Sequence, residues 1–271
     1  MDYQFYIVAT PIGNMSDITL RAIDILKKVD FIACEDTRVT RVLCEKYGFG
    51  AKLFDCHKFN EKERSEKIIL LINEGKSVAL VSDAGTPGIS DPGSVLIKEL
   101  IENDIKITSI PGACAVTTFL SQIPRNNEEY AFVGFIPRVK KQQIDVLSKY
   151  KYTNCLFYES PNRLIETLEN ILDAFGESTK IAVGRELTKL FEEIKIGTIK
   201  EIIEYYKNNT LKGEIVVMVF AKETSDASEE ELKEKILLLK EEGFSDKDIS
   251  IIISKLYNEN KNKIKKLVLD K

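Results

Sequence analysis

The chain has 271 residues, of which 44% are hydrophobic, and carries a formal net charge of −4 at pH 7. This length is typical of roughly two globular domains, and no apolar run approaches the roughly 20 residues that span a bilayer, which argues against a membrane protein. The net charge argues weakly against a nucleic-acid partner, because Lys and Arg carry phosphate binding, but the local distribution of charge matters more.

The cysteines and the single histidine, His57, indicate neither a disulfide framework nor a metal site. The cysteine count of five is odd and no pair has CxxC spacing, so we expect buried thiols in a reducing compartment. His57 has no second imidazole with which to share a metal, and we expect no metal.

The first ten residues lack the basic region of a signal peptide, which makes the cytoplasm the expected location.

The first half of the chain alternates short apolar strands with helices. We predict strands over residues 4–9, 29–34, 77–82 and 106–110, and helices over 17–28, 64–73 and 92–103. Ile18, Ala22 and Ile25 illustrate the helical spacing of the apolar residues. Short apolar strands separated by helices predict an α/β fold with a largely parallel sheet that is covered on both faces.

The second half repeats this alternation with different spacing. Strands are predicted over residues 130–135, 153–158, 180–183 and 214–220, and helices over 161–175 and 199–208. Polar breaks at 121–127 and 224–228 divide the chain into an N-terminal α/β domain (1–121), a C-terminal α/β domain (122–223) and a helical module (229–271).

The helical module has three apolar patterns and an uneven charge. Gly243 is a helix stop and Ser245 an N-cap, and three short helices resemble a helix-turn-helix unit. Residues 255–271 hold six lysines against two acidic residues. We predict that this module helps to hold RNA; the alternative is a solvated helix face that only packs on the enzyme.

Charged residues, Gly or Pro follow six predicted strands, and ligands bind at the carboxyl ends of strands in open α/β sheets. The stretch from Asp83 to Gly93 has three glycines and two prolines between an apolar strand and a helix. It contains neither GxxxxGK[ST] nor GxGxxG, which are the glycine-rich motifs that bind phosphate groups, so the sequence does not indicate a phosphate-binding loop. We interpret it as a ligand-binding loop rather than an ordinary turn.

Five segments carry a resemblance to a known family: ATPIGNMSDIT (9–19), ACEDTR (33–38), VSDAGTPGISDPG (81–93), FYESPNR (157–163) and GRELTK (184–189). They resemble the tetrapyrrole-methylase-fold methyltransferases. Within that fold they are most similar to the bacterial small-subunit ribosomal RNA cytidine 2′-O-methyltransferases of the decoding-site helix. The chain departs from the usual family segments at Ala113 and Cys114 (PGACA for PGPSA) and at Asn162 (FYESPNR for FYESPHR).

The resemblance implies two α/β domains with S-adenosylmethionine in the cleft between them, a homodimer, and 16S ribosomal RNA in the small subunit as substrate. It also implies a helix-turn-helix module at the C-terminal end. The cofactor contacts that it implies are Pro11, Thr86, Pro87, Ile89, Cys114, Ala115, Tyr158 and Leu187.

A ribose hydroxyl is a poor acid, so we expect a base or a charge-stabilising group beside it. The charged strand ends supply Glu35, Asp36 and Lys189 as the preferred catalytic candidates, with Asp83, Glu159 and Glu186 behind them. For RNA we expect contacts from Arg38, Arg138, Lys140 and Arg185. His57, Asn60 and Glu61 stand where family members carry similar residues and are further candidates. Each of the charged strand-end residues could instead form a structural ion pair, and His57 could instead be a surface or hydrogen-bonded residue.

Two other functions share some of these features. A methyltransferase acting on a tetrapyrrole or another small molecule would have the same fold and cofactor. The opening segment ATPIGNMSDIT, the basic stretch at 137–141 and the helical tail favour RNA over that alternative. A non-catalytic RNA-binding module is harder to reconcile with so many charged strand ends.

Overall fold

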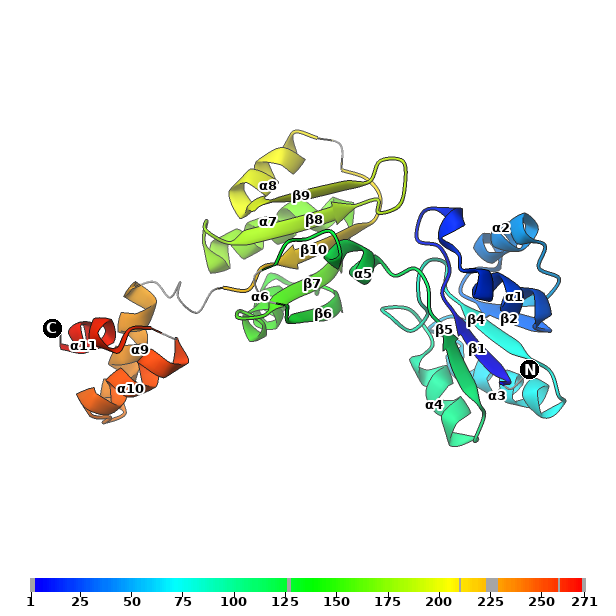
Figure 1. The fold of residues 1–271 in the computed structure, drawn as a ribbon, viewed down its shortest axis with the longest axis horizontal. Coiled ribbons are helices and arrows are strands. Elements are labelled where there is room, and N and C mark those ends of the chain that lie inside the picture. Colours follow the sequence, from blue (N-terminus) through cyan, green and yellow to red (C-terminus); the bar gives the residue numbers. More distant parts are fainter. Residues whose placement is uncertain (1–2, 126–127, 210, 223–228, 258, 270–271) are drawn as a thin grey trace.

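A computed structural model describes residues 3–125, 128–209, 211–222, 229–257 and 259–269. It contains two five-stranded sheets with helices against their faces, followed by a group of three helices at the C-terminal end (Figure 1). Within the described ranges, no helix combines the length and the apolar character needed to cross a membrane.

The first sheet is entirely parallel, as the sequence predicts, with strand order β3-β2-β4-β1-β5. Its strands are β1 (Phe5–Val8), β2 (Phe31–Cys34), β3 (Lys52–Asp55), β4 (Val78–Val81) and β5 (Ile107–Ile110). Strand β3 and the helix before it, α2, were not among the predicted elements.

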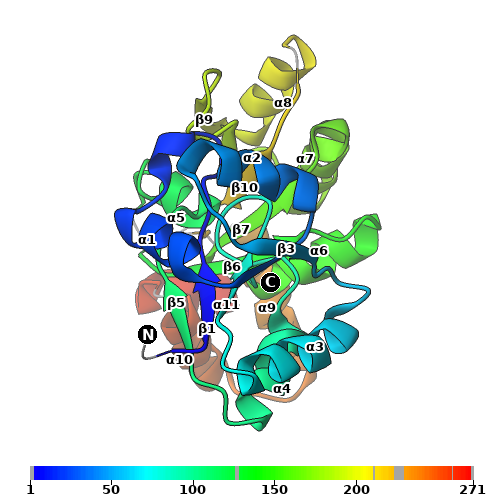
Figure 2. The same ribbon diagram turned by 90° about the vertical axis from the view of Figure 1, so that its right-hand side faces the viewer.

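Helices cover both faces of this sheet (Figure 2), and alternate residues of β1 enter the two cores. Tyr6 packs with α1 (Leu20–Lys28) and α2 (Thr37–Tyr47), whereas Phe5 packs with α3 (Glu61–Asn73) and α4 (Ser94–Glu102). A short 3₁₀ helix, η1 (Met15–Asp17), precedes α1. Helices α1, α3 and α4 lie within the predicted helices or overlap most of them.

The second sheet is mixed, with order β6-β7-β10-β8-β9, and only its β6–β7 pair is parallel. The expectation of a largely parallel arrangement is therefore wrong for this half. Strand β9, which was not predicted, forms a hairpin with β8, and β10 returns between β7 and β8. The strands are β6 (Tyr130–Phe135), β7 (Asn154–Glu159), β8 (Lys180–Arg185), β9 (Glu193–Thr198) and β10 (Ile215–Val219).

One face of the second sheet packs against three helices, α6 (Lys140–Lys149), α7 (Pro161–Phe175) and α8 (Ile199–Lys207). The other face packs against α5 (Ala115–Leu120), whose Phe119 is fully buried beside Leu156 and Val216. Helix α5 precedes the predicted boundary at 121–127, yet it packs on the second sheet. The exact domain limits remain a prediction, and the predicted break at 224–228 lies outside the described residues.

The C-terminal helices are α9 (Glu229–Glu241), α10 (Asp246–Leu256) and α11 (Lys261–Leu269), in agreement with the predicted helical module. Ser245 caps α10 by accepting a hydrogen bond from the backbone N–H of Asp248. The small core includes Leu232, Ile249 and Ile264. Leu237 on α9 and Leu256 on α10, by contrast, are exposed.

Candidate active site

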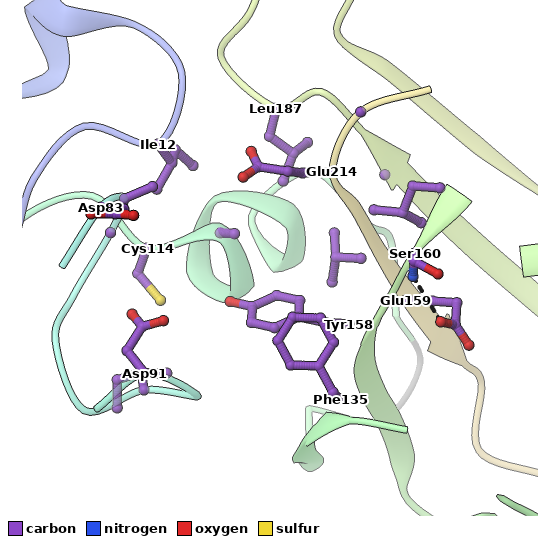
Figure 3. A pocket seen from close by; sticks show the side chains of 18 of the residues that line it. Ile12, Asp83, Asp91, Cys114, Phe135, Tyr158, Glu159, Ser160, Leu187 and Glu214 are labelled. Carbon is purple, nitrogen blue, oxygen red and sulfur yellow. Dashed lines mark hydrogen bonds between the residues drawn. The ribbon is translucent and has the colours of Figure 1, made fainter. Parts of the chain in front are cut away.

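A cavity of about 400 Å³ lies between the two sheets (Figure 3), within the size range of small-molecule sites. The first-sheet wall comes from segments that follow β1, β2, β4 and β5, because the carboxyl ends of parallel strands meet at one edge. The second-sheet wall comes from β6, β7, β8 and β10 and the connections beside them.

The loop from Asp83 to Gly93 forms much of the first wall and is tied to its neighbours by backbone contacts. Gly85 exchanges two hydrogen bonds with Thr10, of 2.8 and 3.0 Å between N and O. The Thr86 hydroxyl donates to the carbonyl of Ala113 at 3.1 Å. Gly85 has φ +81°, and a Cβ there would lie 3.3 Å from Ile12. This position therefore requires glycine both for its backbone conformation and for space.

The second wall is aromatic and closely packed. Tyr158 lies edge-to-face against Phe132 and Phe135, with ring centroids 4.9 and 5.4 Å away. Gly184 also lines the cavity, and a Cβ there would be 2.5 Å from the ring of Phe119. Burial raises the pKa of Tyr158, and its hydroxyl therefore stays protonated at neutral pH.

Three carboxylates gather at the first wall: Glu35, Asp83 and Asp91. Partial removal from solvent raises the pKa of all three, although Glu35 and Asp83 stay exposed as whole residues, and neighbouring carboxylates add to the effect. The pKa of Asp91, which is less exposed, rises to about 6. Among the described residues that line the cavity there is no Lys or Arg. The cavity is therefore suited to a ligand that carries positive charge, and poorly suited to a phosphate.

Asp36 and Arg38 lie beside the cavity but are not among its lining residues. The Asp36 carboxylate accepts from the backbone N–H of Arg38 at 2.8 Å, which caps α2, and pairs with the Arg38 guanidinium at 2.6 Å. The hydrogen bonds from Arg38 lower the pKa of Asp36 to about 2. The backbone N–H of Asp36 donates to Asp83, which connects the cap to the carboxylate group in the cavity.

Lys189 is held by two carboxylates, Glu186 at 2.7 Å and Glu214 at 2.9 Å. Burial acts to lower the pKa of Lys189, but its hydrogen bonds to these two carboxylates outweigh that effect and raise it. Glu214 lines the cavity. Lys189 is therefore connected to the cavity by its ion pair with Glu214. Arg185 lies 3.5 Å from Glu193 and does not line the cavity.

The remaining candidate residues form hydrogen bonds or ion pairs with neighbouring residues of the fold. Glu159 is buried and accepts from the backbone N–H of Ser160 and from the hydroxyl of Thr167, both at 2.7 Å. Glu61 is buried and accepts from two backbone N–H groups at the start of α4, at 3.1 and 3.2 Å. Asn60 donates to Asp55, which also lies 3.7 Å from His57. None of His57, Asn60 and Glu61 is among the described residues that line the cavity.

The cavity brings together most of the cofactor residues that the resemblance implied. Thr86, Ile89, Cys114, Ala115, Tyr158 and Leu187 line it, as does Glu35 from the catalytic candidates. Pro11 and Pro87 do not line it, and neither do Arg138 and Lys140. Arg138 is exposed, and Lys140 pairs with Asp173 at 2.8 Å.

Among the lining residues that were not predicted from the sequence are Asp91, Phe135 and Glu214. Asp91 could have been found, because it stands within the Gly/Pro-rich loop. Phe135 and Glu214 lie at the end or the start of predicted strands and have no motif of their own.

Comparison with known proteins identifies the family. The sequence profile described as Tetrapyrrole (Corrin/Porphyrin) Methylases matches residues 4–203. The chain belongs to the tetrapyrrole methylase family. Solved structures agree on this fold: diphthine synthase superimposes with a TM-score of 0.64 at 15% identity, covering 80% of this chain and 89% of that one. The methyltransferase CobJ superimposes with a TM-score of 0.62 at 17% identity, covering 82% and 95%.

Within the tetrapyrrole methylase family, this chain is similar to proteins named Ribosomal RNA small subunit methyltransferase I. The protein from Escherichia coli O157:H7 is 38% identical over 274 residues, covering 98% of this chain and 95% of its own length. The protein from Mesorhizobium japonicum is 44% identical over 217 residues, covering 79% and 74%. The similarity to the first of these extends through the C-terminal helices.

Proposed function

We propose that this chain methylates the 2′-oxygen of a cytidine ribose in 16S ribosomal RNA, with S-adenosylmethionine as methyl donor. The observation that carries the proposal is the 38% identity to Ribosomal RNA small subunit methyltransferase I of E. coli O157:H7 over nearly the whole of both chains. Membership of a methylase family supports the type of reaction.

The lining of the cavity fits this cofactor. S-adenosylmethionine carries positive charge on its sulfonium and amino groups, and the cavity offers carboxylates without a lysine or arginine among its described lining residues. Thr86, Cys114, Ala115, Tyr158 and Leu187 would hold it against the two walls. When bound, the cofactor supplies an electrophilic methyl group; the protein holds the ribose oxygen in line with that group.

A proton must leave the ribose hydroxyl, and of the three catalytic candidates Glu35 is the one that lines the cavity. We assign the proton-accepting role to its carboxylate. Asp36 acts by fixing the start of α2 directly after Glu35. Lys189 acts by holding Glu214 at the opposite wall.

The RNA backbone requires cations, which the cavity does not supply but the surface does. Arg38 has a side chain that is 89% exposed, and Arg138 and Lys140 follow the end of β6. Arg185, whose side chain is mostly buried, is the fourth phosphate contact of the proposal, and the lysines of α11 add further contacts from the C-terminal module.

We also propose a cytoplasmic homodimer that acts on the small ribosomal subunit. The relatives named for this rRNA support the location, and the exposed Leu190 and Phe191 in the β8–β9 connection, 89% and 68% exposed, offer apolar surface for a second copy. Light scattering after gel filtration tests the dimer: a molecular mass near twice 30.7 kDa is expected.

The competing function is methylation of a tetrapyrrole or another small molecule. The two solved structures compared above are at most 17% identical to this chain. They therefore support the fold and not the substrate. The two functions are separated by incubating the enzyme with methyl-labelled S-adenosylmethionine and, in parallel, unmodified small subunits, free 16S rRNA and a porphyrinogen. Label in rRNA is expected; label in the porphyrinogen alone would overturn the proposal.

A further inference from the structure

Strand β6 carries an irregularity beside the cavity. Its pairing with β7 matches Phe132 to Leu156 and Phe135 to Tyr158, so three steps on β6 correspond to two on β7. The extra residue is accommodated near Gly134, which has φ +72°, a backbone conformation that residues with a side chain rarely adopt. Such a bulge changes the face on which the following side chain lies.

The bulge moves Phe135 from the core to the cavity. In a regular strand, side chains alternate between faces, so Phe135 would share the face of Val133, which packs against the helix-covered core. Instead it lies beside Phe132 on the opposite face, and both rings contact Tyr158 edge-on. Ile136 then returns to the helix-covered core. Figure 3 shows Phe135 next to Tyr158 at the wall of the cavity.

Phe135 is 64% exposed although it lines the cavity. Its neighbour Gly134 lies against the opposite wall, where a Cβ would be 3.1 Å from the Ser90 hydroxyl. The ring therefore stands where the two walls meet, in a T-shaped contact with Tyr158 and with much of its surface open. Full burial of a large apolar side chain is favourable, and the bulge gives up that burial for Phe135, so a ligand that covers the ring is the expected compensation.

We propose that Phe135 is the platform on which the target base stacks while its ribose is methylated. The inference rests on the proposed function and assigns a residue to it. A nucleotide inside a helix cannot reach an enclosed site, and enzymes that modify nucleotides turn them out and hold the base on an aromatic ring. Phe135 supplies such a ring at the entrance. Arg138, three residues further on and exposed, supplies a cation near the adjoining phosphate.

The position of the ring favours the RNA base over the cofactor. The lining residues Cys114 and Tyr158 are half-buried and Leu187 is buried, so the part of the cavity beside them is the more enclosed one. Phe135 is the more exposed of the two aromatic residues among the described residues that line the cavity. A molecule that entered first would occupy the enclosed part, and the exposed ring would remain for the second reactant.

The test compares Phe135→Ala and Phe135→Tyr with the parent on unmodified small subunits, with S-adenosylmethionine affinity measured by calorimetry. Stacking of one base on an aromatic side chain changes the binding constant for the nucleic acid roughly 5- to 150-fold. We expect Phe135→Ala to lose kcat/KM by that factor while cofactor affinity stays within about twofold of the parent. Phe135→Tyr should stay close to the parent, because it keeps the ring.

Tyr130→Ala is the matched control. Tyr130 is on the same strand, is 49% exposed, and is not among the described residues that line the cavity. Its removal should leave kcat/KM unchanged. Melting temperatures of all variants exclude loss of the fold as the cause.

A second substrate makes the test specific for the base. Subunits reconstituted with an abasic ribose at the target position should be methylated equally slowly by the parent and by Phe135→Ala, because neither can stack the missing base. Unchanged activity of Phe135→Ala, a loss explained by weaker cofactor binding, or the same loss on the abasic substrate would each overturn the inference. Failure of the parent to label any rRNA would instead overturn the proposed function.

Discussion

Replacing Asp91 by Asn should make the protein more stable at neutral pH and a weaker binder of its cofactor. Asp91 lines the cavity with Glu35 and Asp83. Burial, followed by the charge of Glu35, raises its pKa from 3.8 to about 6. The ionised side chain is therefore unfavourable in the folded state unless a positively charged ligand compensates it.

The raised pKa of Asp91 sets both the sign and the size of the expected change in the free energy of unfolding. Because the folded state binds the proton more tightly than the unfolded state, Asp91 lowers the free energy of unfolding progressively as the pH rises from about 4 to about 6. The difference of about 2 pKa units corresponds to at most about 3 kcal/mol at 1.36 kcal/mol per unit. Since the side chain is only partly buried, solvent screening reduces the expected effect to about 1–2 kcal/mol.

The assay is thermal and urea unfolding of Asp91→Asn and the parent at pH 7 and pH 4, without cofactor. We expect a gain of about 1–2 kcal/mol at pH 7, which is about 2–8 °C in Tm for a protein of this size, and little gain at pH 4. Asp24→Asn, on the exposed side of α1, removes one charge outside the cavity and controls for net charge. Calorimetry at pH 7 should show weaker S-adenosylmethionine binding by Asp91→Asn alone. No stabilisation at pH 7, or an equal gain at both pH values, would show that the ionised Asp91 side chain does not destabilise the folded protein.

Three further changes probe other parts of the molecule. Gly85→Leu should abolish S-adenosylmethionine binding in calorimetry, because position 85 has φ +81° and little space, whereas Gly50→Leu, with open space around it, should bind normally. Truncation after Ala227 should keep cofactor affinity but flatten the dependence of log K for RNA on log salt by roughly 1.5–2.5 units, since two or three phosphate contacts are lost at about 0.7–0.9 each; an unchanged slope would assign the tail a structural role. Glu61→Ala should lower the free energy of unfolding by about 0.5–2 kcal/mol, because it removes the acceptor at the start of α4, and the exposed Glu66→Ala serves as its control in urea unfolding.

The sequence predicts the first sheet well because its strands are short apolar runs between amphipathic helices. It does not reveal β3, whose four residues begin with an exposed Lys52 and end with Asp55, so that little apolar pattern is present. Nor does it reveal the direction of the strands in the second sheet. The hairpin between β8 and β9 turns through Glu186 and Thr188, which have φ +52° and +64°. Because neither Glu nor Thr favours a positive φ, the sequence gives no sign of this turn.

In the site, too, some features can be recognised from the sequence and others cannot. The loop from Asp83 to Gly93 is recognisable because its glycines and prolines are too dense for an ordinary turn. The roles of Asp36 and Glu61 as helix caps depend on partners that only the fold brings close. Phe135 could not be assigned to the cavity from alternation along β6, because one extra residue in the strand reverses the face on which it lies.

Locating the methyl group on the RNA tests directly whether this enzyme methylates a ribose oxygen. Small subunits that lack this modification are incubated with the enzyme and S-adenosylmethionine, and the extracted 16S rRNA is subjected to alkaline hydrolysis and nucleoside mass spectrometry. We expect a single 2′-O-methylcytidine, seen as one phosphodiester that resists alkali because the neighbouring 2′-oxygen is blocked. A methyl group on a base, with normal cleavage at that position, would contradict it.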